Sequence, residues 1–185
     1  FSGYDATVHK SRVIGVFGNA VVLDETPFYA FSGGQLCDKG MFGDSKVLDV
    51  VKMPNGQHLH ILDNNPYKVG DIVLSQVDIE NRNLTRKNHS SAHLLQSALK
   101  EVLGSHVHQQ GSQVSSDYCR FDFNNYNSLT DEEILKIEDL VNQPVEKKTE
   151  KMKIRHEGGV VIQGVQNLLI RISRCCNPVP GDQIV

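Results

Sequence analysis

The sequence predicts an α+β protein that begins with a small β-barrel and continues into an α+β core with a two-stranded tail. Residues 12–78 form a run of short β-branched and apolar segments separated by Gly, Asn, Pro and Asp. Near residue 79 the hydrophobic period changes from two to 3.6, which indicates helices. Beyond residue 143 the composition changes again. We therefore expect three parts, at residues 1–80, 81–146 and 147–185.

Short strands at regular spacing are typical of a small barrel or sandwich. The segment between the second and third strands, TPFYAFSGGQLCDKGMFGD at 26–44, is rich in Gly and aromatic residues and is predicted to be an ordered loop. The five predicted strands are RVIGVF (12–17), AVVLDE (20–25), KVLDVVKM (46–53), GQHLHILD (56–63) and DIVLSQVD (71–78).

Two helices that flank a strand pair are predicted for the second part. The first covers residues 88–103, and Gly104 stands where a C-cap glycine is expected. The second begins at Thr130, which forms a capping-box pattern with Glu133. The strand pair between them is SHVHQQGSQVS (105–115) and YCRFDFN (118–124). The predicted apolar sides are Ala92, Leu95, Ala98, Leu99, Val102 and Leu103, with Leu94 at the edge, and Ile134, Leu135, Ile137, Leu140 and Val141.

Composition and charge exclude several classes of protein. A net charge of −3 and a pI of about 6.2 provide no overall positive field for nucleic acid, so any RNA contact is local or depends on another domain. No stretch is long and apolar enough to span a membrane, and the N-terminus lacks a secretory signal pattern. The four cysteines show no disulfide spacing, which predicts a reduced, cytoplasmic protein. The start at Phe1 rather than Met indicates a fragment or a processed chain.

His89 and His93 are separated by four residues on the first predicted helix, so both imidazoles project from one side within reach of one metal ion. Helical phase places the pair off the core-facing side, beside Gln96 and Lys100. Two solvated histidines on a polar face are the alternative. No Glu follows His89, so the HExxH pattern of zinc proteases is absent.

Two glycine-containing segments are the other candidates for a site. In TPFYAFSGGQ (26–35), adjacent glycines allow a positive φ or a close approach of a ligand, and Gln35 offers a donor and an acceptor. The alternative is a tight turn with buried aromatic residues. In HQQGSQV (108–114), Gln109 and Ser112 flank Gly111, and the alternative is a strand that turns at a glycine.

Six segments in a fixed order resemble the editing region of alanyl-tRNA synthetases and the free-standing AlaX-type trans-editing proteins. The resemblance covers about residues 1–146, so that residues 81–146 are similar to the editing core. The segments are FSGYD (1–5), TPFYAFSGGQ (26–35), KNHSSAHLLQSALKEVLG (87–104), HVHQQGS (106–112), RFDF (120–123) and IEDLVNQ (137–143).

The resemblance implies a hydrolase that acts, without ATP, on the ester of Ser-tRNA(Ala) or Gly-tRNA(Ala) and contacts the acceptor end of tRNA(Ala). An alanine pocket excludes neither the smaller glycine nor a near-isostere with one more hydroxyl, so a second hydrolytic site is needed. The implied cofactor is zinc, held by an HxxxH and a later CxxxH. The implied site residues are His89 and His93 as metal ligands, Gln109 with Ser32, Gly33, Gly34 and Gln35 as catalytic pocket residues, and Ser90, Ser91 and Ser112 as hydroxyl partners of the substrate.

This chain departs from the family at two places. The family usually has Glu where Phe31 stands, and the CxxxH half of the zinc site is missing. We hypothesise that Cys175 or Cys176 replaces the missing ligand, with water or His156 as the fourth; free structural cysteines are the alternative.

The tail is similar to a different family. GGVVIQGVQNLLIRISRCCNPVPGDQIV at 158–185, and about residues 151–185 as a whole, resemble the C-terminal regulatory region of RelA/SpoT alarmone synthetase/hydrolases. A fusion of two incomplete pieces, joined near residues 144–153, is therefore one interpretation. Another is a non-catalytic regulatory or RNA-binding module whose tail contacts ribosomal RNA or a protein.

Overall fold

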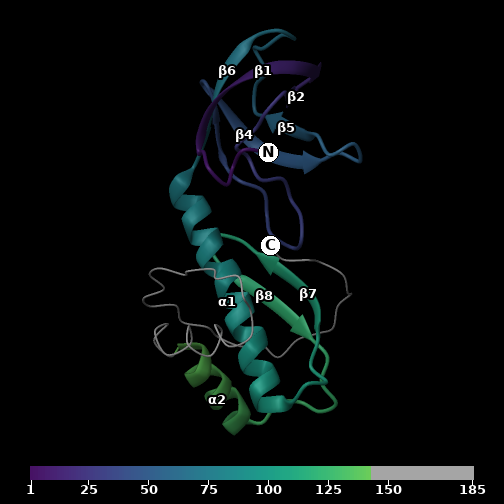
Figure 1. Ribbon diagram of the computed structural model, residues 1–185, viewed down its shortest axis with the longest axis vertical. Coiled ribbons are helices and arrows are strands. Elements are labelled where there is room, and N and C mark those ends of the chain that lie inside the picture. The colour runs from purple at the N-terminus through teal and green to yellow at the C-terminus, as the bar shows by residue number, and fades with distance from the viewer. Residues whose placement is uncertain (143–185) are drawn as a thin grey trace. The chain divides into compact units, whose positions relative to one another are not determined.

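The computed structural model describes residues 1–142, which belong to two compact units. Unit 1 contains residues 1–86 and 113–118, and unit 2 contains residues 87–112 and 119–142. The helix α1 (Ile79–Leu103) begins in unit 1 and ends in unit 2 (Figure 1). The predicted two-stranded tail lies outside the described residues, and the predicted boundaries at residues 80 and 146 stay predictions.

Unit 1 contains a closed barrel of six antiparallel strands in the order β1-β2-β5-β4-β3-β6. Closure leaves no strand edge unpaired, which protects such a small sheet from pairing with other chains. The strands are β1 (Val8–Phe17), β2 (Ala20–Leu23), β3 (Gly40–Phe42), β4 (Ser45–Lys52), β5 (His58–Leu62) and β6 (Ile72–Val77).

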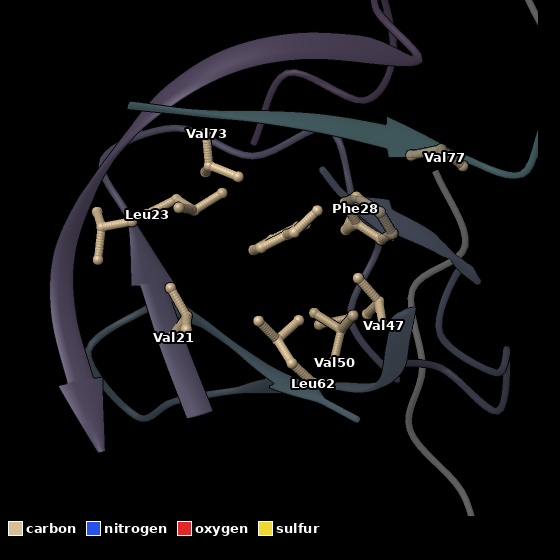
Figure 2. Close-up of a cluster of buried hydrophobic side chains, with 11 residues drawn as sticks. Val21, Leu23, Phe28, Val47, Val50, Leu62, Val73 and Val77 are labelled. Atoms are coloured by element: carbon tan, nitrogen blue, oxygen red, sulfur yellow. The ribbon is translucent and has the colours of Figure 1, made fainter. Parts of the chain in front are cut away.

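The interior of the barrel is filled by aliphatic side chains around two phenylalanines (Figure 2). Strand β6 shows the expected period of two, because Val73 and Val77 face inward while Ile72 and Leu74 are exposed. The aromatic rings of Phe28 and Phe42 meet edge to face, with centroids 5.4 Å apart. The buried cluster is Val13, Val21, Leu23, Phe28, Ala30, Phe42, Val47, Val50, Leu62, Val73 and Val77.

The expected α+β class and the five predicted barrel strands are confirmed, but the prediction of an unbroken loop at residues 26–44 is wrong. Strand β3 lies within that segment. Its central residue Met41 pairs with Lys46 on one side and with Gln76 on the other. Gly40 is required there because a Cβ at this position would overlap the Gln76 carbonyl. A strand of three residues is too short to show a recognisable pattern in the sequence, and its pairing with β6 depends on residues far along the chain.

In unit 2 the second part of α1 packs against α2 (Asp131–Asn142) and β8 (Cys119–Phe123), and β8 pairs with β7 (Gln109–Val114) in a two-stranded sheet (Figure 1). The predicted strand pair and second helix are therefore confirmed. The buried residues are Leu94, Ala98, Leu99, Val107, Ile137 and Val141.

The helix ends follow capping rules. Thr130 and Glu133 form the predicted capping box, in which the Thr130 N–H donates to Glu133 Oε2 over 2.8 Å. Gly104 ends α1 with a φ of 114°, as predicted. However, α1 begins at Ile79 rather than at residue 88, because Asp78 Oδ1 accepts the Asn81 N–H over 3.0 Å and caps the helix earlier.

Two positions on the predicted apolar sides are corrected. Leu135 is exposed, because it lies about 100° around the helix from Ile134, away from the side that holds Ile137 and Val141. Leu94 is buried in the unit 2 core rather than at its edge. Neither helix of the described residues combines the length and the apolar character needed to cross a membrane.

Candidate functional site

His89 and His93 stack on each other along α1, with ring centroids 5.3 Å apart and an interplanar angle of 27°. Both side chains are half-buried. Burial lowers the pKa of each imidazole, and His93 further lowers the pKa of His89. The pair is therefore neutral at neutral pH, which is the form that ligates a metal ion.

The zinc site implied by the resemblance is matched by the described residues only in part. A structural or catalytic zinc needs at least three protein ligands, and residues 1–142 contain no group of three or more His, Cys, Asp or Glu side chains that would share one ion. Burial raises the pKa of the Cys119 thiol in unit 2 to about 11, so this cysteine stays protonated. The histidine pair thus fits two ligand positions. Cys175, Cys176 and His156 lie outside the described residues.

The serines beside the histidine pair differ in their surroundings. Ser91 is buried, and its hydroxyl donates to the Lys87 carbonyl over 2.8 Å, within its own helix. This bond is the usual way in which a serine inside a helix satisfies its hydroxyl. Ser90 is half-buried.

Gln109 and Ser112 are brought together at β7. The Gln109 side-chain amide nitrogen donates to Ser112 Oγ over 3.1 Å, and both residues are half-buried. This bond leaves the Gln109 carbonyl oxygen as an acceptor whose direction the amide plane fixes.

Residues 32–35 of unit 1 form a two-residue β-turn. The Gln35 N–H donates to the Ser32 carbonyl over 2.9 Å, and the Ser32 N–H donates to the Gln35 carbonyl over 3.3 Å. Gly33 and Gly34 have φ values of 59° and 76°, the two left-handed conformations of a type I′ turn. The adjacent glycines thus have a positive φ within a tight turn, which was the alternative interpretation of this segment, and side chains other than Asn or Asp would strain the turn.

The turn is tied to the chain near Val114, which is also part of unit 1. The Val114 N–H donates to the Gly34 carbonyl over 2.8 Å, and the Val114 carbonyl accepts the Leu36 N–H over 2.9 Å. These two bonds make a short parallel bridge between Gln35 and Val114.

A buried ion pair that the sequence did not reveal lies at the base of the same loop. The Arg82 guanidinium contacts both carboxylate oxygens of Asp38, and both residues are buried. Arg82 sits in a polar stretch of α1 and Asp38 in the predicted loop, and no local pattern connects them.

The sequence is similar to that of known aminoacyl-tRNA synthetases. The family model for class II (A) tRNA synthetases matches residues 4–81. An alanine–tRNA ligase from Acholeplasma laidlawii is 48% identical over 145 residues, which cover 78% of this chain and 17% of that protein. The alanine–tRNA ligase of Geobacillus thermodenitrificans is 41% identical over 164 residues, 78% of this chain and 19% of that protein. The chain carries a domain of the alanine–tRNA ligase family.

This alanine–tRNA ligase domain is a small part of the proteins that it matches. The chain spans less than a fifth of the length of these relatives, and alanine–tRNA ligase 1 of Lachnoclostridium phytofermentans, 41% identical over 166 residues, is covered to 19%. The predicted likeness of the tail is also confirmed in sequence, because residues 160–185 match the RelA/SpoT RIS domain.

Proposed function

We propose that this chain hydrolyses the ester bond of tRNA(Ala) mischarged with serine or glycine. The observation that carries the proposal is the stacked, neutral His89–His93 pair in a domain of the alanine–tRNA ligase family. Water adds its hydroxyl to the acyl carbon, the bond to the ribose oxygen breaks, and that oxygen takes a proton. The products are a free amino acid and uncharged tRNA.

The chemistry of alanine selection creates the need for such a step. A pocket that accepts alanine discriminates poorly against glycine, which is one methyl smaller, and against serine, which adds only one hydroxyl. A separate hydrolytic site corrects both errors. The relatives are named alanine–tRNA ligases, which is the reason for choosing tRNA(Ala) as the substrate.

In this proposal, different residues bind the acyl group and the metal ion. The Gln109 carbonyl oxygen, held by the bond to Ser112, accepts from the α-amino group or from the hydroxyl of a seryl ester. The glycines of the Ser32–Gln35 turn in unit 1 carry no side chain, so the turn backbone would permit close approach of an acyl group. His89 and His93 would hold zinc together with ligands from elsewhere, and zinc would polarise the ester carbonyl when bound.

The test of this function is a comparison of two esters. The full chain is incubated with Ser-tRNA(Ala) and with Ala-tRNA(Ala), with added zinc and with a chelator. Preferential loss of the seryl ester supports the proposal. Equal rates for both esters, at the level of a protein-free blank, would overturn it.

A second candidate is a binding module without catalysis, and the match of residues 160–185 to the RelA/SpoT RIS domain favours it. In this alternative the editing-type fold is a scaffold, and the tail contacts ribosomal RNA or a protein. It predicts unchanged binding in His89→Ala and no release of amino acid from any charged tRNA. The ester comparison therefore separates the two candidates.

A further inference from the structure

Arg82 joins three segments of unit 1 that are distant in sequence. Its Nη1 donates to the Gly3 carbonyl over 2.8 Å, and its Nη2 donates to the Pro27 carbonyl over 2.5 Å. Its Nε donates to Asp38 Oδ1 over 3.1 Å, and Nη2 also contacts Asp38 Oδ2. The side chain is only 8% exposed, so these partners replace nearly all of its hydration.

The geometry of these contacts requires arginine. Two parallel contacts to one carboxylate and two more to carbonyls use the planar fork of the guanidinium. A lysine ammonium at this position would retain the charge but would not reach both carboxylate oxygens and both carbonyls. The Arg82 guanidinium therefore contacts the N-terminal segment, Pro27 and Asp38 at the same time.

Asp38 transmits this connection to the loop that bears the Ser32–Gln35 turn. The Asp38 carboxylate accepts the Tyr29 N–H over 2.6 Å, and the Asp38 N–H donates to the Tyr29 carbonyl over 3.1 Å. The Tyr29 hydroxyl in turn donates to the Ser32 carbonyl over 3.2 Å. The loop is thus a small ladder whose base is Tyr29 and Asp38 and whose tip is the turn.

Apolar packing does little to hold the tip. Phe31 and Leu36, which flank the turn, are 55% and 37% exposed. Buried apolar side chains of the loop, Phe28 and Ala30, lie at or near its base. Hydrogen bonds restrain the turn instead: the Phe31 N–H donates to the Val50 carbonyl of β4 over 3.1 Å, Val114 bonds to Gly34 and Leu36, and the Arg82–Asp38 pair holds the base of the loop.

We propose that Arg82 is a positioning residue: through Asp38 it fixes the Ser32–Gln35 turn within unit 1. Its role in catalysis rests on the proposed ester hydrolysis, whereas its role in placing the turn does not. Loss of the Arg82 guanidinium is expected to let the Ser32–Gln35 turn move while the barrel stays folded.

The experiment compares Arg82→Lys with Val73→Ala in the full chain. Arg82→Lys keeps the charge and removes the fork. Val73→Ala removes core volume from β6, outside the loop, and serves as the matched destabilised control. Amide exchange measured by NMR is expected to rise by about tenfold or more at Val114 and Gln35 in Arg82→Lys, with the barrel amides unchanged. Val73→Ala is expected to raise exchange across the barrel without this selectivity.

Steady-state deacylation of Ser-tRNA(Ala) is the second readout. We expect kcat of Arg82→Lys to fall on the order of 10- to 100-fold with little change in KM, because a shift of about 1 Å in a positioned group has effects of that size. Val73→Ala is expected to keep kcat per folded molecule.

Three results would overturn the inference. These are uniform exchange across unit 1 in Arg82→Lys, selective exchange with unchanged kcat, and an equal loss of kcat in Val73→Ala. If Arg82→Lys does not fold, Asp38→Asn, which replaces one of the two acceptor oxygens that face the fork with an amide N–H donor, must show the same selective exchange. A wild-type chain that releases no serine contradicts the proposed function, and the exchange data still decide whether Arg82 places the turn.

Discussion

The imidazoles of His89 and His93 stack one helical turn apart on α1, and burial keeps both of them neutral. This relationship distinguishes the pair from two exposed histidines on a polar face, which would carry pKa values close to the ordinary one. A half-buried pair of neutral imidazoles is ready to ligate a metal ion without first losing protons.

Removal of either imidazole should weaken zinc binding. We expect His89→Ala and His93→Ala to lower zinc affinity at pH 7 by at least tenfold, since each removes one of the two ligands that the described residues supply. His108→Ala, which removes an exposed histidine of unit 2, is the control and should bind as the wild type does. Isothermal titration with zinc measures the three affinities, and equal affinities would exclude the pair as ligands.

The hypothesis that the tail completes the metal site has its own test. Zinc content of a Cys175→Ala/Cys176→Ala protein, measured by mass spectrometry after dialysis, should fall below that of the wild type. These thiols would supply the third ligand, without which two histidines bind weakly. Unchanged zinc content would refute the hypothesis.

Stability should decrease as the pH falls below the ordinary pKa of histidine, because of His60. Its Nδ1–H donates to the Val21 carbonyl over 3.0 Å and its Nε2 accepts from the Thr26 hydroxyl over 2.8 Å, so the buried ring is neutral. Burial lowers its pKa to about 4. The unfolded chain binds this proton near pH 6.5 and the folded chain only near pH 4, so stability is full above pH 6.5 and is lost as the pH falls through that window.

The expected loss attributable to His60 is about 3 kcal/mol of unfolding free energy between pH 6.5 and pH 4. Urea unfolding at a series of pH values measures it in the wild type and in His60→Gln. The variant should lose part of the pH slope, whereas His108→Gln should keep the whole of it. A slope that is the same in His60→Gln and the wild type would contradict the account.

Two glycine substitutions should have the same effect on stability but different effects on activity. Gly33→Ala and Gly18→Ala should each cost about 1 kcal/mol of stability, because both glycines have a φ near 60°. Gly18 lies in the turn between β1 and β2, and a Cβ there meets no other atom within 4 Å. Only Gly33→Ala should also slow deacylation of Ser-tRNA(Ala), and equal activity of the two variants would remove the turn from the site.

Loss of the hydrogen bond between Gln109 and Ser112 should change the relative rates at which the seryl and glycyl esters are hydrolysed. Ser112→Ala should cost about 1 kcal/mol of stability, since one hydrogen bond of the Gln109 amide is lost. Deacylation of Ser-tRNA(Ala) should slow more than that of Gly-tRNA(Ala). Only the seryl ester has a hydroxyl that donates to the Gln109 carbonyl oxygen, and this oxygen changes its direction when Ser112 is lost. Ser97→Ala, on the exposed side of α1, is the control. A proportional change for both esters would exclude Ser112 from recognition.

The barrel and both helices could be predicted because their patterns are local. Five strands show β-branched runs between turn residues, and Thr130 with Glu133 marks a helix start within four residues. Strand β3 and the first turns of α1 lack such patterns. The residues from Ile79 to Lys87 are mostly polar, and their helical conformation depends on the Asp78 cap.

The candidate site was predictable to a similar extent and for the same reason. The spacing of His89 and His93 and the two glycines of the turn are features of neighbouring residues. The Arg82–Asp38 pair depends on residues 44 positions apart that meet only when the barrel has closed. Pairing of this kind leaves no periodicity in the sequence, so the residue that we infer to place the turn was not foreseen.

The most direct measurement of the central claim is the ratio of the rate constants for hydrolysis of Ser-tRNA(Ala) and Ala-tRNA(Ala) by the full chain with zinc. The account predicts that the seryl ester is cleaved on the order of 100-fold faster than the alanyl ester, and that His89→Ala lowers the seryl rate towards the blank. A ratio of one, or a seryl rate that His89→Ala leaves unchanged, would contradict it.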